Sequence, residues 1–123
     1  MNILKIQMKE QQQGCFFITL DGPLDTYTHE RLDEFTARIM VPGTRSIAID
    51  MGKVNYISSM GVGSLFKIRK FTKQANANFL LVALQPQVQK VLDTVQALPP
   101  GCVFQSIQEL DEYLDTIQKR SQQ

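Results

Sequence analysis

The stretch that decides the fold of this chain is NYISSMGVGSL, residues 55–65. A polar loop becomes an apolar run here, so Ser58 or Ser59 is predicted to cap a helix, its hydroxyl facing the first free N–H groups. Gly61 and Gly63 fall in the first turn, where each glycine weakens a helix by about 1 kcal/mol relative to alanine. Glycine also keeps the backbone exposed and lets another molecule come close. Two interpretations remain open: capping alone, or a serine that accepts phosphate at the positive end of the helix dipole.

The segments on either side of this stretch alternate between short apolar strands and amphipathic helices. Ser46–Asp50 is apolar and follows a Pro-Gly turn, so it is predicted to be a buried strand parallel to an earlier one. The predicted strands are residues 3–9, 15–20, 46–50, 79–84 and 103–104. The predicted helices are one that ends near Met40, one over 58–73, one that opens at Gln85-Pro86 and ends at Leu98, and one over 107–117.

This element order predicts a single α/β domain. The first two strands form a hairpin, and the whole order is β-β-α-β-α-β-α-β-α. A mixed sheet of about five strands flanked by about four helices accounts for every segment. Residues 1–118 are predicted to form the domain, and residues 119–123 a polar tail that frays.

The composition excludes several classes of protein. The 123 residues carry 13 Lys or Arg against 12 Asp or Glu, a net charge of +1. No basic excess therefore points to a nucleic-acid partner. No stretch is long and apolar enough for a membrane helix or a secretion signal, so no direct membrane insertion is expected. Cys15 and Cys102 stand far apart and are predicted to be buried thiols in a reducing cytoplasm.

Recognisable catalytic and metal-binding motifs are missing from the sequence. His29 is the only imidazole, and we expect it to be a solvated residue in the first turn of a helix. Gly52-Lys53 lacks the Ser or Thr of a phosphate-binding loop. Asp50 ends a strand, but closing its own loop is favoured over accepting a phosphate. We therefore expect no catalytic residue, metal or cofactor, and an enzyme built on Asp21, Asp25 and Asp50 is the weakest alternative.

Two motifs carry a family resemblance, Tyr56–Gly63 (YISSMGVG) and Gly22–Asp25 (GPLD). The first follows a typical run of an aromatic residue, Ile or Met, Asp or Ser, Ser, a small residue, Gly, Leu and Gly. The second is similar to a Gly-x-Leu-Asp sequence that leads into a first helix. With this order and spacing along the chain, the two motifs resemble those of the STAS domain. This fold is shared by anti-sigma factor antagonists and the cytoplasmic domains of sulfate transporters. The resemblance covers nearly the whole chain.

The resemblance implies a bacterial anti-sigma factor antagonist, which regulates transcription and has no catalysis of its own. Such a protein binds a partner that is both a serine kinase and an anti-sigma factor, and phosphorylation by that kinase releases it. A PP2C-type phosphatase resets the switch. By motif position the acceptor is Ser59, and Asp25 is expected to contact the partner or orient the site. The implied partner-binding residues are Asp25, Ser58, Ser59, Met60, Gly61, Val62 and Gly63.

Three residues depart from the family pattern. Ser58 stands where the best-known antagonists have Asp, so it offers the kinase a second hydroxyl and is the alternative acceptor. Met60 replaces a small residue and adds apolar area that could select a different partner, and Pro23 stands where a charged residue is common. A neutral Ser58 and a bulky Met60 also fit a STAS subunit that is never phosphorylated and belongs to a transporter or a sensory assembly.

Overall fold

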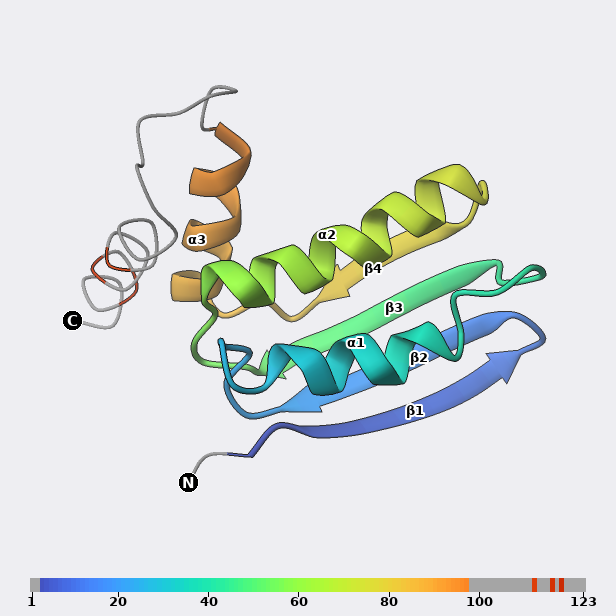
Figure 1. The fold of residues 1–123 in the computed structure, drawn as a ribbon, viewed down its shortest axis with the longest axis horizontal. Helices are drawn as coiled ribbons and strands as arrows, with labels where there is room; N and C mark the ends of the chain where they lie inside the picture. The colour runs from blue at the N-terminus through green and yellow to red at the C-terminus, as the bar shows by residue number, and fades with distance from the viewer. Residues whose placement is uncertain (1–2, 98–111, 113–115, 117, 119–123) are drawn as a thin grey trace.

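The chain begins with a β-hairpin and continues with alternating helices and strands (Figure 1). The computed structural model describes residues 3–97, 112, 116 and 118. The elements of the described part are β1 (Lys5–Gln12), β2 (Cys15–Asp21), α1 (His29–Ala37), β3 (Ser46–Lys53), α2 (Ser59–Gln74), β4 (Asn78–Val82) and α3 (Pro86–Ala97).

The described strands form one mixed sheet in the order β1-β2-β3-β4. β1 and β2 are antiparallel, and the turn between them holds Gly14 at a φ of 79°, a left-handed conformation that glycine adopts without strain. β3 is parallel to β2 and β4 is parallel to β3, because α1 and α2 carry the chain back to the same end of the sheet. The mixed α/β sheet predicted from the sequence is confirmed.

The described residues differ from the predicted elements in number and in length. They form a sheet of 4 strands with helices α1, α2 and α3, against about five strands and four helices expected for this layered arrangement. The strand predicted at 103–104, most of the helix predicted at 107–117 and the tail at 119–123 lie outside the described residues. Glu112, Thr116 and Gln118 are helical. The domain boundary at residue 118 stays a prediction.

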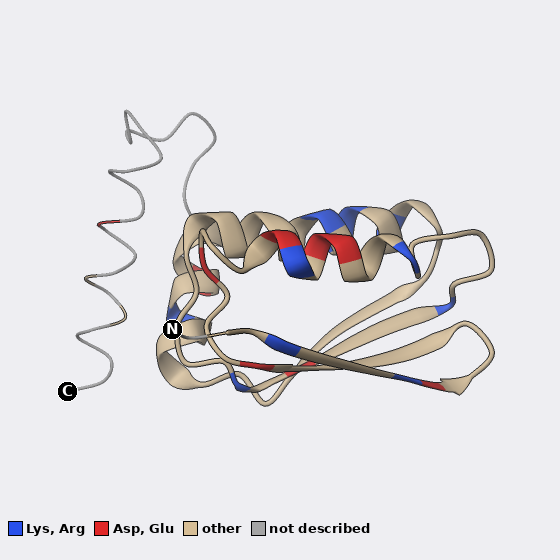
Figure 2. Cartoon of the chain, turned by 60° about the horizontal axis from the view of Figure 1, so that its bottom comes forward, with Lys and Arg blue, Asp and Glu red and all other residues tan. Residues whose placement is uncertain are grey.

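Much of the core lies between the sheet and two helices that cover one of its faces, and Val88 and Val91 of α3 belong to the same cluster. α1 and α2 run side by side across that face (Figures 1 and 2). Alternate strand residues and one stripe of each helix point into the space between them. The buried side chains there include Leu20, Leu32, Ile47, Ile49, Met51, Leu65 and Ile68.

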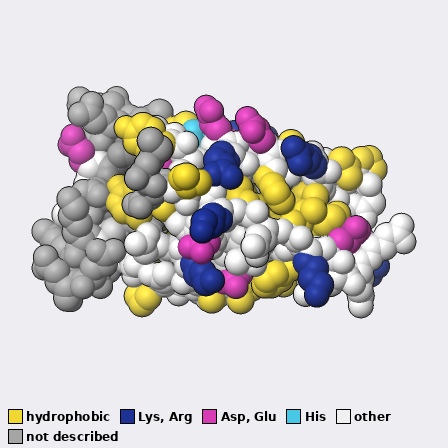
Figure 3. Space-filling view, turned by 90° about the horizontal axis from the view of Figure 1, so that it is seen from below, with side chains coloured by type: hydrophobic (Ala, Val, Ile, Leu, Met, Phe, Trp, Pro, Cys, Tyr) yellow, Lys and Arg dark blue, Asp and Glu magenta, His cyan; other side chains and the backbone are white. Residues whose placement is uncertain are grey.

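Acidic and basic side chains are mixed on one face of the molecule. On the face seen in Figure 3, Lys and Arg lie among Asp and Glu without a large area of one sign. That mixture agrees with the net charge of +1. A single added phosphate would therefore be a large local change in charge.

Cys15 is partly exposed, so the prediction that it is buried was wrong. Successive residues of a strand point to opposite faces of the sheet. Ile18 and Leu20 of β2 are buried under the helices, and Cys15 therefore lies on the other face. The apolar run CFFITL did not reveal which of its residues face the core. Cys102 lies outside the described residues.

Candidate functional site

Two loops that are far apart in the sequence pair at the start of α2. Leu24 and Ile57 form an isolated parallel β-bridge. The backbone N–H of Leu24 donates to the Tyr56 carbonyl, and the N–H of Ser58 donates to the Leu24 carbonyl, each over 3.0 Å. The GPLD motif and the YISSMGVG motif therefore lie side by side, as one site.

Ser58 is the N-cap of α2. Its backbone is extended, with a φ of −98° and a ψ of 174°, and its Oγ accepts a hydrogen bond of 3.3 Å from the Gly61 N–H. The residue is only 4% exposed. Ser58 thus satisfies one of the N–H groups that a helix leaves free at its start, and the prediction that one of the two serines caps this helix is confirmed.

Ser59 is the first helical residue of α2 and does not occupy the cap position. The residue is partly buried, and its hydroxyl oxygen is buried. The first turn of α2 contains no acidic residue, so no carboxylate of that turn offsets the positive end of the helix dipole. Negative charge placed on Ser59 would be favoured there.

The two glycines of the first turn have different surroundings. A Cβ atom at Gly61 would overlap the carbonyl oxygen of Leu24 and would also lie 2.9 Å from the Leu24 Cγ. A Cβ atom at Gly63 would meet nothing within 4 Å. Gly61 therefore serves the close packing of the two loops and is buried, whereas Gly63 leaves open space on the surface. The expectation of an exposed backbone holds only for Gly63, which is partly exposed.

Asp25 organises the turn that leads into α1. Its Oδ1 accepts hydrogen bonds from the N–H groups of Tyr27, at 2.9 Å, and Thr28, at 3.0 Å. The Thr28 Oγ1 accepts from the Asp25 N–H and donates to the Pro23 carbonyl. Side-chain oxygens that bind nearby N–H groups are typical of Asp in turns. Of the two roles expected for Asp25, the geometry supports orientation of the site, and partner contact stays a prediction.

The predicted partner-binding residues divide into exposed and buried members. Ser58, Gly61 and Val62 are buried, so their effect on a partner would be through the shape of the turn. The partly exposed members are Asp25, Ser59, Met60 and Gly63. These four can offer surface to a partner.

His29 is buried, so the expectation of a solvated residue was wrong. It is 8% exposed, and its Nδ1 lies 3.4 Å from Asp33 Oδ2 and 3.5 Å from the Oγ of Ser64 on α2. The polar neighbours of His29 in the sequence obscured the helical period that places it with Leu32 on the inner side of α1. Asp33 in turn pairs with Lys67 of α2 at 3.2 Å.

This cluster links α1 to α2 and does not resemble a catalytic triad. In a triad, the carboxylate and the nucleophilic hydroxyl bind opposite nitrogens of the imidazole ring. Asp33 and Ser64 both approach Nδ1 of His29. The arrangement therefore holds the two helices together and does not activate the Ser64 hydroxyl.

Two exposed aromatic residues, one in the Asp25 turn and one on α2, were not predicted from the sequence to belong to the site. Tyr27 is 90% exposed in the turn built by Asp25, and Phe66 is 41% exposed on α2, seven residues after Ser59. Residues seven apart lie on one side of a helix. The only available signal was that Phe66 falls outside the apolar stripe of Val62, Leu65 and Ile68.

Other predicted features behave as simple structural elements. The Asp50 Oδ1 accepts a hydrogen bond of 2.9 Å from the Gly52 N–H, so Asp50 closes its own loop as predicted. Within the described part of the chain, no group of three or more His, Cys, Asp or Glu residues could hold a metal ion. None of the described helices is long and apolar enough to cross a membrane.

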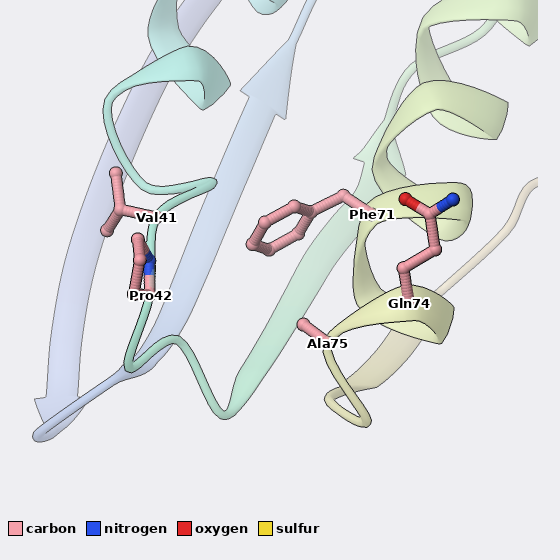
Figure 4. A pocket seen from close by; sticks show the side chains of 5 residues that line it. All are labelled: Val41, Pro42, Phe71, Gln74 and Ala75. Atoms are coloured by element: carbon pink, nitrogen blue, oxygen red, sulfur yellow. The ribbon is translucent and has the colours of Figure 1, made fainter.

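A shallow apolar hollow lies at the far end of α2 (Figure 4). Val41 and Pro42 line one side of it, and Phe71, Gln74 and Ala75 line the other. Phe71 follows Ser59 by twelve residues, which is about 18 Å along a helix. The hollow is therefore separate from the serine site.

Comparison with known proteins identifies the family. The model of the STAS domain matches residues 7–110 of the chain. The chain belongs to the STAS domain family. This STAS domain is 27% identical over 90 residues to BtrV of Bordetella bronchiseptica, a protein assigned to the anti-sigma factor antagonists, and the match spans 73% of this chain and 77% of BtrV.

Solved structures share the fold of this STAS domain. The unphosphorylated form of the anti-sigma factor antagonist SpoIIAA matches with a TM-score of 0.67 and 19% identity, over 75% of this chain and 81% of that one. The phosphorylated form of SpoIIAA from Bacillus matches with a TM-score of 0.64 and 18% identity, over 74% and 83%. The murine anion transporter Slc26a9 matches with a TM-score of 0.63 and 18% identity, over 94% of this chain but 22% of the transporter.

Proposed function

We propose that this STAS domain is an anti-sigma factor antagonist that acts as a phosphorylation switch in bacterial partner switching. The unphosphorylated protein binds a serine kinase that is also an anti-sigma factor, in the cytoplasm. Phosphorylation of Ser59 releases it, and a PP2C-type phosphatase restores it. The domain itself performs no catalysis. The observation that carries this proposal is the placement of Ser59 at the first position of α2, beside a separate capping serine.

The geometry favours Ser59 over Ser58 as the acceptor. The Ser58 Oγ holds the Gly61 N–H and lies in a residue that is almost fully buried. A phosphate on Ser58 would replace this cap and would have to fit beside the paired Leu24 and Ile57 segments. Ser59 does not occupy the cap position, so its modification leaves the Ser58 cap in place.

The electrostatics of the helix start suit a reversible phosphate. A phosphoserine brings about −1.5 to −2 charges at neutral pH. Negative charge at a helix N-terminus stabilises the helix by about 0.3–1 kcal/mol, so the fold tolerates the modification. The same charge opposes docking of a partner surface that fits the neutral serine.

The exposed residues around Ser59 suit a protein partner. Met60 and Gly63 are partly exposed, Phe66 adds exposed aromatic area seven residues along α2, and Tyr27 adds it in the turn that Asp25 builds. Aromatic residues and Met are enriched in protein interfaces. We expect the kinase to bind across this surface and to reach Ser59 from it.

A STAS subunit that is never phosphorylated, within a transporter or a sensory assembly, is the second candidate. The likeness to part of the murine anion transporter supports it. The antagonist and the transporter subunit share the fold, so the fold alone does not distinguish them. The presence or absence of phosphate on Ser59 distinguishes them.

The experiment that tests the proposal is intact-mass and phosphosite analysis of the protein purified from its own cells. We expect a fraction of molecules with one added phosphate on Ser59. Incubation of the purified protein with ATP and its serine kinase should add one phosphate to wild type and to Ser58→Ala, and none to Ser59→Ala. An equal yield of phosphate on Ser59→Ala would contradict the assignment of the acceptor.

A further inference from the structure

The backbone of Ile57 is hydrogen-bonded to the side chain of a residue far along the chain, Gln118. The Ile57 N–H donates to Oε1 of Gln118, and Nε2 of Gln118 donates to the Ile57 carbonyl, both over 2.8 Å. We call this pair of hydrogen bonds the Gln118 clamp. The two residues are 61 positions apart, and Gln118 lies beyond residues 7–110 that match the family model.

The Gln118 clamp completes a small paired structure. On one side of the 56–58 segment, Leu24 bonds to Tyr56 and Ser58. The N–H and C=O of Ile57 point to the other side, where Gln118 meets them. A glutamine amide carries a donor and an acceptor, like a peptide group, so Gln118 acts as one residue of an added strand.

The Gln118 clamp resists opening because both partners are buried. Gln118 is 1% exposed and Ile57 is fully buried. Opening the clamp without admitting water would leave two buried donors and two buried acceptors unsatisfied, which is unfavourable. The segment that leads directly into Ser58 and Ser59 is therefore held from both sides.

The hydroxyl that the kinase must reach lies next to this held segment. Phosphoryl transfer requires the attacking oxygen to line up with the γ-phosphate at close range. The hydroxyl oxygen of Ser59 is buried. The oxygen must therefore become exposed before transfer, and Ile57 is only two residues away.

We propose that the Gln118 clamp restrains phosphorylation of Ser59 by holding the turn before α2 closed. The clamp must open before the Ser59 hydroxyl enters the kinase, so the rate of phosphorylation scales with the open fraction. Gln118 acts on Ser59 through Ile57 and is a positioning residue. The proposal rests on Ser59 being the acceptor in the proposed function, but the opening of the clamp can be measured without a kinase.

The first test measures opening in the full chain with Gln118→Met, which keeps the approximate shape of the side chain and removes the two hydrogen bonds to Ile57. Gln87→Met is the matched control, because Gln87 is also buried and its Nε2 bonds to the Asn55 carbonyl, just before the clamped segment. Hydrogen exchange of the Ile57 amide should be about five- to tenfold faster in Gln118→Met, the combined effect of losing two hydrogen bonds that each contribute near the low end of the usual net range. The control should leave it unchanged.

A chemical probe measures the exposure of position 59 itself. Ser59→Cys in a Cys15→Ser/Cys102→Ser background places a thiol at the acceptor position. Iodoacetamide should label this thiol faster by the same factor when Gln118→Met is added, and Gln87→Met should leave the labelling rate unchanged. Equal labelling with and without Gln118→Met would overturn the proposal.

The second test uses ATP and the serine kinase of the same cells, at protein concentrations where the rate reports kcat/KM. Phosphorylation of Gln118→Met should exceed that of wild type by the factor found in hydrogen exchange, and Gln87→Met should match wild type. An unchanged or slower rate, together with faster exchange, would mean that rotation of the serine side chain alone exposes the oxygen, and it would overturn the proposal. Absence of phosphate on Ser59 in every variant would instead contradict the proposed function.

The wild-type protein provides a check if Gln118→Met does not fold. The Ile57 amide must then exchange as slowly as the amides of Leu24 and Ser58, which belong to the same paired segment. Fast exchange at Ile57 beside slow exchange at Leu24 and Ser58 would overturn the clamp. Gln118→Ala, which removes the amide without a bulky replacement, repeats the comparison.

Discussion

A Cβ atom at Gly61 would overlap the carbonyl oxygen of Leu24. That carbonyl accepts the hydrogen bond of the Ser58 N–H, so the first turn of α2 can lie against the loop before α1 only if position 61 has no side chain. Leu24 of the GPLD motif therefore requires a glycine at position 61 of the YISSMGVG motif. The position of the two serines therefore depends on a pairing of two loops within the domain.

The two glycines should respond in opposite directions to the same substitution. Gly61→Ala places a methyl group against the Leu24 backbone, so we expect the free energy of unfolding to fall by about 1–3 kcal/mol. Gly63→Ala has open space around it and should raise stability by about 0.5–1 kcal/mol, because alanine favours the helix. Urea unfolding of the two variants measures both values. Equal destabilisation by both substitutions would show that Leu24 is not the cause.

The two serines should contribute differently to stability. Ser58→Ala removes the cap and should lower the free energy of unfolding by about 1 kcal/mol, within a usual range of 0.5–2. Ser59→Ala should lower it by less than Ser58→Ala does, because the Ser59 hydroxyl does not cap the helix. Urea unfolding of the single variants and of the double variant gives the comparison. A larger loss of stability in Ser59→Ala than in Ser58→Ala would contradict the assignment of the structural role to Ser58.

A negative charge should block partner binding only at position 59. Ser59→Asp places a carboxylate in the proposed contact surface, and we expect affinity for the kinase to fall about tenfold or more, which corresponds to about 1.4 kcal/mol. Ser58→Asp is the matched control, because aspartate is a good N-cap and adds the same charge one residue earlier. Isothermal titration calorimetry measures both affinities. Retained affinity in Ser59→Asp would argue against release by phosphorylation.

The role of Asp25 can be divided by two substitutions. Asp25→Asn keeps an oxygen that accepts from the N–H groups of Tyr27 and Thr28, so the free energy of unfolding should change little. Asp25→Ala removes this acceptor and should cost about 1–2 kcal/mol. If kinase affinity falls in Asp25→Asn while stability is kept, the charge itself contacts the partner. Thermal unfolding and calorimetry on both variants decide between orientation and contact.

Tyr27 should matter for binding and not for folding. The side chain is 90% exposed, so Tyr27→Ala should change the free energy of unfolding by less than about 0.5 kcal/mol. If Tyr27 belongs to the contact surface, kinase affinity should fall by about 1 kcal/mol or more. Leu80→Ala on β4 is the control, because Leu80 is also exposed but lies on a strand outside the proposed surface. Equal losses of affinity for both variants would remove Tyr27 from the site.

Much of the fold could be predicted from local patterns. The apolar run of β3, the hairpin before it and the helical stripe of Val62, Leu65 and Ile68 each report the faces of a single element. Local residue types also indicated that one of the two serines caps α2, and the structure showed that it is Ser58. Such patterns say little about which face of one element meets another, and for that reason the partial exposure of Cys15 and the burial of His29 were mispredicted.

The sequence by itself determined the α/β order, the helix that starts at the two serines and the STAS motifs, because strand alternation, helical periodicity and capping act over a few residues. Only the tertiary structure decided that Leu24 lies against Ile57 and Gly61, that His29 lies on Ser64, and that Gln118 holds Ile57. These contacts join residues 33 to 61 positions apart. They form only when the helices and strands pack together. Packing buries polar groups such as the Ile57 N–H, and a buried polar group needs a hydrogen-bond partner that can come from any part of the chain.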